Sequence, residues 1–417
     1  MQGSELGNQC DAQAHASWLN RNVFVIGLTS LLSDTGHEMA TAVLPAFLAV
    51  LGVPAAALGV IEGVADATSS FVKLWAGWIS DRLGHRKAIA VGGYVLTGLS
   101  KSLFAFAYGW PLILVGRVAG WFGRGIRAPL RNAILADSVP DHAHGKAFGF
   151  ERAGDTLGAV FGPLVAFGVL TLWPPTTANP SGSYRTIFLL TLIPGLSAAL
   201  AFGTLVGERR RAPSPTKFTA ALRNLPQPFR RFLLAVGVFG MGDFAHTLLI
   251  LAATELLAPS YGMARAAQIA ILLYVVHNVF YASASYPAGA LSDRWGRKGL
   301  LVAGYVLGAI TALGCLAAFA WSVAAVPFLL AVFAAGGIYV AVEEALEAAM
   351  TADLVPPEIR GTAFGALGTV NGIGDLFASA VVGVLWTAVS PVAAFGYAAA
   401  LMLGGGAALA RLRSSVK

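Results

Sequence analysis

Two apolar stretches of the sequence each hold an aspartate and a histidine three residues apart. The first contains Asp34 and His37, and the second contains Asp243 and His246. Imidazoles titrate near neutral pH, and a carboxyl group withdrawn from water can also hold a proton there, so both types suit proton transfer. The same nitrogen and oxygen atoms suit a divalent transition metal. A structural role, in which each aspartate only orients its own helix, is the third interpretation.

Other charged residues in apolar stretches need a partner or a task, because each costs at least about 2.5 kcal/mol at the centre of a membrane. Glu62 and Asp66 lie four residues apart and share a helix face. Arg117 stays charged and therefore needs a carboxylate partner. The candidates are Glu62, Asp66, Asp34 and Glu38. Protonation of that carboxylate would free the arginine for an anionic substrate group or another carboxylate, and would so couple protons to substrate.

Two further groups of charges predict a gate. Arg127 and Arg131 are four residues apart, and a shift of 216 places them on Glu343 and Glu347. Opposite charges at equivalent helix ends predict an inner gate that closes across the molecule when the protein faces outward. The alternative, in which each group pairs within its own half, remains open. Away from the ends of the apolar stretches, the basic residues all lie in the first half, whereas the second half holds only acidic ones.

The composition indicates which elements position these residues. Of 417 residues, 56% are hydrophobic and only 12% are charged, against about 25% charged in soluble domains. Mean hydropathy is +0.69. These values exclude a soluble enzyme, a disordered chain and a small disulfide-stapled domain, and they predict membrane-spanning helices. The sequence contains twelve stretches of this kind: 22–51, 57–79, 88–108, 111–134, 147–173, 185–207, 231–257, 265–290, 299–321, 324–350, 363–389 and 392–411.

The distribution of lysine and arginine predicts the orientation. Most of them fall in the loops of one side and in the tails, so both termini are expected in the cytoplasm. The net charge of +7 then reflects topology and gives no reason to expect a nucleic-acid partner. The basic, proline-containing segment 208–231 is expected to be a cytoplasmic linker between two bundles, 1–207 and 232–417.

The two halves carry the same motifs. Residues 77–87 recur as 289–298, and blocks within 136–149 recur within 352–365. Parallel repeats of six spans predict a pseudo-two-fold axis along the membrane normal, with a substrate path between the halves. We expect the aspartate of each repeated loop to face the N-terminus of a neighbouring helix. We also expect an arginine of the loop to reach the aspartate of the second repeated block, and we call this pair of contacts a latch. The alternative is that the arginines only determine the membrane topology. The two sets are Asp81, Arg82, Arg86 and Asp137, and Asp293, Arg294, Arg297 and Asp353.

The pattern G-x-x-S-D-R-x-G-x-R-K of residues 77–87, with its copy at 289–298, resembles the signature loop of the major facilitator superfamily. Gly116 and Arg117 resemble that family's intramembrane arginine motif, and Gly154, Gly158 and the pair 162–163 resemble its antiporter motif. The resemblance implies an all-α membrane protein with twelve transmembrane helices in two pseudo-symmetric six-helix bundles. It also implies that spans one and seven line a central cavity, where the two aspartate–histidine pairs would converge.

These observations predict a proton-coupled secondary transporter of a small molecule that works by alternating access. Export or antiport is favoured over import. We expect no cofactor, with the proton gradient as energy source, and no enzymatic activity, because the sequence has no Walker A motif or nucleophile setting. A divalent transition-metal transporter built on the two aspartate–histidine pairs is the alternative. The expected partners are the lipid bilayer and a small-molecule or ion substrate, and the expected state is a monomer in the inner (plasma) membrane.

Overall fold

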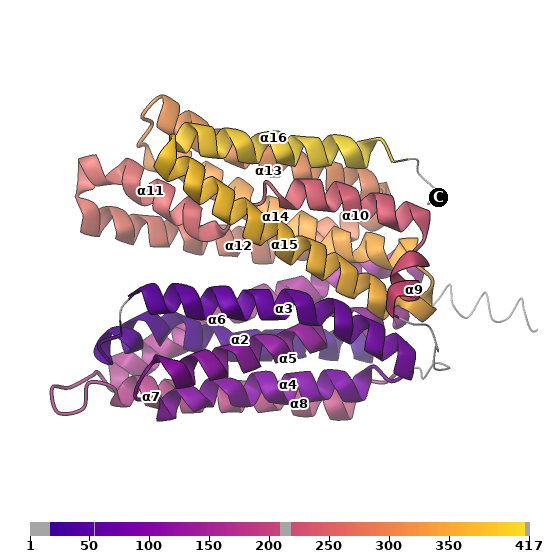
Figure 1. Cartoon of the computed structure of the whole chain (residues 1–417), viewed down its shortest axis with the longest axis horizontal. Coiled ribbons are helices and arrows are strands. Elements are labelled where there is room, and N and C mark those ends of the chain that lie inside the picture. Colours follow the sequence, from indigo (N-terminus) through magenta and orange to yellow (C-terminus); the bar gives the residue numbers. More distant parts are fainter. Residues whose placement is uncertain (1–16, 54, 209–217, 413–417) are drawn as a thin grey trace, which may run out of the picture.

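The computed structural model describes residues 17–53, 55–208 and 218–412, and within these ranges it is helical without strands. Two groups of helices lie beside each other (Figure 1). The first group comprises α2 (Arg21–Val50), α3 (Ala55–Leu83), α4 (Lys87–Ser102) with η1 (Leu103–Phe106), α5 (Trp110–Asp137), η2 (Asp141–Ala143), α6 (His144–Leu172), α7 (Gly182–Leu190) and α8 (Leu192–Leu205). The second group comprises α9 (Phe218–Arg223), α10 (Gln227–Gly240), α11 (His246–Tyr261), α12 (Met263–Trp295), α13 (Arg297–Ala320), α14 (Val326–Leu354), η3 (Pro357–Ile359), α15 (Arg360–Ala388) and α16 (Pro391–Ala410).

Every predicted stretch is covered by a helix or by a pair of consecutive helices. Among the described residues, eight helical segments have the length and apolar composition to cross a membrane. Helices α2, α3 and α5 are just as long, at 30, 29 and 28 residues, but they contain embedded charged residues. Most of the candidate functional residues in the first half of the sequence lie on these three helices.

The seventh stretch is interrupted, which the sequence did not lead us to expect. Helix α10 ends at Gly240 and α11 begins at His246, and α10 begins at Gln227, inside the segment assigned to the linker. Glycine is a poor helix former, and three glycines fall within residues 237–242. Irregular backbone at membrane depth is tolerated where protein surrounds it. Here the N–H of Ala245 donates to the hydroxyl of Ser379 on α15 at 3.0 Å.

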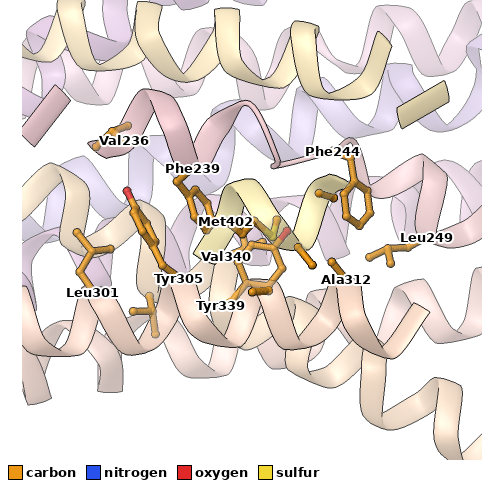
Figure 2. Close-up of a cluster of buried hydrophobic side chains, with 14 of the residues drawn as sticks. Val236, Phe239, Phe244, Leu249, Leu301, Tyr305, Ala312, Tyr339, Val340 and Met402 are labelled. Atoms are coloured by element: carbon orange, nitrogen blue, oxygen red, sulfur yellow. The ribbon is translucent and has the colours of Figure 1, made fainter. Parts of the chain in front are cut away.

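Each bundle has its own apolar core. In the second bundle the aromatic rings of Phe239 and Tyr305 stack with centroids 3.8 Å apart, and Tyr339 packs edge-on against Phe239 (Figure 2). In the first bundle Phe47, Phe104 and Phe188 form a comparable cluster. Each bundle is thus packed around aromatic side chains of its own.

The bundles meet through glycines near the repeated loops. We call this end of the molecule, which carries residues 77–87 and 289–298, the motif end. A Cβ atom on Gly77 of α3 would lie 2.1 Å from the carbonyl oxygen of Gly361 on α15, and one on Gly289 of α12 would lie 1.9 Å from that of Gly145 on α6. Backbones therefore touch at two pseudo-symmetric places, and the motif end is closed.

Candidate functional site

The first latch joins the end of α3 and the loop after it to the start of α15. The carboxylate of Asp81 accepts hydrogen bonds from the backbone N–H groups of Gly361 and Thr362 at 3.2 and 2.6 Å. The guanidinium of Arg86 bridges Asp81 and Asp137, at 2.8 and 2.7 Å. A carboxylate at a helix N-terminus is favourable because it satisfies N–H groups that have no partner within the helix. The predicted latch contact from Arg86 to Asp137 is confirmed.

The second latch repeats this arrangement with the bundles exchanged. Asp293, at the end of α12, accepts from the N–H groups of Gly145 and Lys146 at the start of α6, both at 2.9 Å. Arg297 lies 3.0 Å from Asp293 and is also ion-paired with Asp353. Each bundle thus inserts a carboxylate at a helix N-terminus of the other, as the sequence predicted.

A second arginine or a histidine completes each latch, and sequence reasoning missed both residues. Arg360 reaches Asp137 across the bundle interface at 2.7 Å, and His144 reaches Asp353 at the same distance. The two residues are separated by 216 positions, which is the offset of the second repeated block. Aligning the residues just before the repeated Gly-x-x-Phe-Gly blocks would have revealed them.

The remaining arginines of the two repeated loops take no part in the latches. Arg82 lies over the ring of Trp78, 5.3 Å from its centroid. Arg294 is exposed. Of the arginines considered for each latch, the one that follows the turn makes the contact.

Further inside the molecule, a line of charged side chains crosses from one bundle to the other. Arg124 on α5 lies 3.0 Å from Asp34 on α2 and 3.8 Å from Asp155 on α6. Arg152 on α6 lies 3.3 Å from Asp155 and 3.0 Å from Glu344 on α14 of the other bundle. We call these five residues the transverse network. Tyr281 of α12 also donates a hydrogen bond to the Glu344 carboxylate.

The two arginines of the predicted gate pair inside the first bundle instead. Arg131 is buried and lies 2.7 Å from Glu151. Arg127 is 2% exposed and places its guanidinium over the ring of Tyr94, 4.4 Å from the centroid. Both side chains point into their own bundle and away from the interface.

The acidic half of that gate is likewise satisfied within the second bundle. Glu347 accepts hydrogen bonds from Tyr305 at 2.5 Å and from Asn371 at 2.7 Å. Glu343 is buried and lies one helical turn after Tyr339, which donates to Asp243. The predicted inner gate is therefore wrong for this closed motif end, and the alternative of pairing within each half holds. Burial explains the outcome, because a charge inside a bundle needs a partner at short range.

The break between α10 and α11 presents Asp243 to α14. Tyr339 donates to one carboxylate oxygen of Asp243 at 2.9 Å, and Glu343 lies one helical turn after Tyr339 on the same face of α14. Two acidic side chains therefore lie near the break, and neighbouring carboxylates favour the protonation of one of them.

Near α2, the indole ring of Trp121 lies against the side chains of His37 and Arg117. The ring of His37 packs edge-on against Trp121 with centroids 5.5 Å apart, and its Nε2 lies 4.0 Å from the carboxylate of Glu38. Arg117 donates to the hydroxyl of Thr41 at 3.1 Å and lies 5.8 Å from the Trp121 centroid. Asp34, one of the expected partners of the intramembrane arginine, is paired with Arg124 instead.

The two aspartate–histidine pairs do not form one site. Asp34 and His37 contact partners of the first bundle, whereas His246 lies against His277 of the second, with ring centroids 4.8 Å apart. In the part of the chain that the structure describes, no group of three or more histidine, cysteine or acidic side chains has the geometry of a metal site. The prediction of convergence is wrong, and the metal alternative built on Asp34, His37, Asp243 and His246 loses its geometric basis.

Glu62 and Asp66 lie on α3, but their side chains are outside the described residues. The prediction that they share a face and neutralise an intramembrane cation stays a prediction.

The transverse network was also missed as a site. Its members were recognised only as charged residues inside spans, because the partner of Arg152 lies almost two hundred positions away. The spacing of Arg152 and Asp155, one helical turn apart, is the signal that could have drawn attention to it.

Comparisons with known proteins agree with this architecture. The family model described as Major Facilitator Superfamily matches residues 26–274 and 232–416. The chain is 32% identical over 391 residues to an MFS-type transporter of Methanocaldococcus jannaschii, covering 92% of this chain and 93% of the relative. It is 27% identical over 145 residues to the quinolone resistance protein NorA of Staphylococcus aureus, covering 35% of this chain and 37% of NorA.

Among solved structures, a variant of the E. coli fucose:proton symporter FucP superimposes with a TM-score of 0.76 at 15% identity, covering 96% of this chain and 100% of FucP. This likeness shows the fold. Together with the family match over both halves and the duplicated latches, it identifies the chain as a member of the major facilitator superfamily, a transporter of small molecules.

Proposed function

We propose that this transporter is driven by the proton gradient and exports its substrate by alternating access. The observation that carries the proposal is the position of two acidic residues at a break in a membrane helix: Tyr339 of α14 donates to Asp243 at 2.9 Å, and Glu343 lies one turn further along α14. Away from the ends of its helices, the second bundle has acidic residues but no basic ones. A buried carboxyl pair that gains and loses a proton is a suitable coupling element.

The transverse network supplies a route from protonation to movement. Glu344 follows Glu343 in the sequence and binds Arg152 of the other bundle at 3.0 Å. Protonation of a carboxylate in the network would weaken its hold on an arginine and so alter the contact between bundles. Such a change biases the equilibrium between closed and open motif ends, which is what coupling requires.

Export is supported by the local similarity to NorA, since removal of a drug from the cell is one route to resistance. The excess of basic residues in the loops and tails at the motif end supports a cytoplasmic location of this end and of both termini, in a plasma or inner membrane. In that orientation the structure would represent a state closed toward the cytoplasm. We propose a monomer without a cofactor as the working unit.

Flux measured in proteoliposomes with an imposed pH gradient tests this proposal, with a fluoroquinolone as the first probe. We expect the gradient to drive accumulation of the probe by the wild type. Glu343→Gln keeps a polar side chain of the same size beside Asp243 but cannot gain or lose a proton, so the variant should fold and exchange substrate but lose gradient-driven accumulation. The matched control is Glu255→Gln, an exposed position on α11. Accumulation by Glu343→Gln and Asp243→Asn at the wild-type level would contradict the proton role of this pair.

A further inference from the structure

At the motif end of the first bundle, a carboxylate caps the start of α4. Glu208, the only acidic residue in the segment 208–231, accepts hydrogen bonds from the backbone N–H groups of Arg86 and, at 3.1 Å, Lys87. The first N–H groups of a helix have no partner within the helix and carry partial positive charge, so an anion is favoured there. Glu208 thus acts as an internal ligand, and it lines a cavity of about 280 Å³.

The repeat-related place in the second bundle is the start of α13. Arg297 corresponds to Arg86, because each bridges the two aspartates of its latch, and Lys298 then corresponds to Lys87. The loop is one residue shorter here, and Gly296, the residue before α13, provides no side-chain cap. The start of α13 faces a cavity of about 890 Å³, roughly three times the volume of its counterpart in the first bundle.

Three cationic side chains line this larger cavity, which we call the α13 cavity. Arg231 of α10 is exposed and makes no ion pair with a described residue. Lys298 donates to the carbonyl oxygen of Leu412 and likewise has no acidic partner among the described residues. The side chain of Arg297 is 10% exposed, and its Nε is buried without a hydrogen-bond partner. Charge and an unsatisfied donor therefore converge where the first bundle has Glu208.

The acidic residues of the α13 cavity are already engaged elsewhere. Asp293 caps the start of α6, and Asp353 is held by Arg297 and His144. Asp141 is 88% exposed and lies 3.8 Å from Arg360. These carboxylates are paired with groups of the latches, so the positive charges of Arg231 and Lys298 remain available for a ligand.

We propose that the α13 cavity binds a phosphate-bearing anion, which occupies the position that Glu208 fills in the first bundle. The anion accepts from the N–H groups at the start of α13 and pairs with Arg231 and Lys298. It is either a phosphorylated solute or the headgroup of an anionic phospholipid, two sources that share the same chemistry. Because Arg297 belongs both to the cavity and to the second latch, a bound anion stabilises the closed motif end.

The experiment follows thermal unfolding of the purified, delipidated protein while inorganic phosphate replaces chloride at constant ionic strength. Phosphate should raise the unfolding temperature in a saturable way. The double variant Arg231→Gln with Lys298→Gln should raise the half-saturating concentration by about tenfold or more, as expected for the loss of charge-assisted hydrogen bonds. Lys87→Gln is the matched control and should respond like the wild type, because Glu208 already fills that site.

A second variant keeps the test informative if the double variant folds poorly. Leu412→Glu places a carboxylate in the lining of the α13 cavity and should reduce the response to phosphate without removing any cation. A chloride response equal to that of phosphate, or an unchanged phosphate response in both Leu412→Glu and the double variant, would overturn the proposal.

Nanodiscs distinguish the two sources of the anion. If a phospholipid headgroup is the ligand, nanodiscs of phosphatidylglycerol should show the raised unfolding temperature without added phosphate, and nanodiscs of phosphatidylcholine should not. If a solute is the ligand, phosphate should raise the temperature equally in both lipids. Absence of a response in both lipids, with and without phosphate, would again contradict the site.

Discussion

At the scale of single residues, Arg152 joins the two bundles through its ion pair with Glu344. Arg152→Gln leaves Glu344 with Tyr281 as its partner among the described residues and removes one neighbour each of Asp155 and Glu151. Loss of one member of a charged hydrogen-bonded pair should lower the free energy of unfolding by about 1–3 kcal/mol. Glu344→Gln together with Arg152→Gln should recover part of that loss, since no charge is then stranded. Thermal unfolding of the four proteins of this double-mutant cycle measures the coupling.

The control for this cycle is Arg294→Gln, which removes an exposed arginine of α12. It should change stability by less than about 0.5 kcal/mol. Purely additive effects of Arg152→Gln and Glu344→Gln would show that the contact seen between the bundles contributes nothing to stability.

At the scale of helices, the contact between α3 and α15 and that between α12 and α6 leave no space for a methyl group. Gly77→Ala and Gly289→Ala would place a Cβ atom 2.1 and 1.9 Å from backbone oxygens of the other bundle. Backbone cannot move aside as a flexible side chain can, so the double variant should separate the bundles at the motif end. Alkylation of a cysteine introduced at Ala352, which is 1% exposed, should become faster in a background without native cysteines.

Gly92→Ala on α4 and Gly383→Ala on α15 provide the control, because nothing lies within 4 Å of a Cβ atom at either position. Alanine is the better helix former and should stabilise each helix slightly. Equal alkylation rates in the Gly77/Gly289 variant and in this control would refute the idea that glycine contact holds the motif end closed.

The helices themselves could be predicted from the sequence because the length of an apolar stretch is a local property. The latches could also be predicted, since Asp81 and Asp293 recur with their loops. Side-chain partners within the bundles could not: Arg131 pairs with Glu151 on a helix that no spacing rule connects to it. The gate prediction assumed that equivalent positions meet at the axis, whereas the rotation of α5 and α14 about their own axes turns these side chains inward. Helix rotation depends on packing, which the repeat alone does not specify.

At the scale of the whole molecule, the two latches set the balance between a closed and an open motif end. Asp81→Asn together with Asp293→Asn keeps an acceptor at each helix N-terminus but removes the charge that binds Arg86 and Arg297. The double variant should populate the open state more than either single variant, because each latch contributes separately. Distances between spin labels at the motif end, measured by pulsed electron resonance, should show a longer population. A distribution identical to the wild type would contradict a locking role for these aspartates.

The second cationic or imidazole partner of each latch differs between the repeats, and this difference predicts an order of events. Arg360 is a permanent cation, whereas the imidazole of His144 can hydrogen-bond Asp353 without carrying a charge. The Asp137 contact is therefore a charge-assisted pair, and the Asp353 contact of His144 is the weaker of the two. A molecule with one stronger and one weaker contact would open asymmetrically, beginning on the histidine side. His144→Arg should make the two contacts alike, and distances between labels at the motif end should then show a smaller open population than in the wild type.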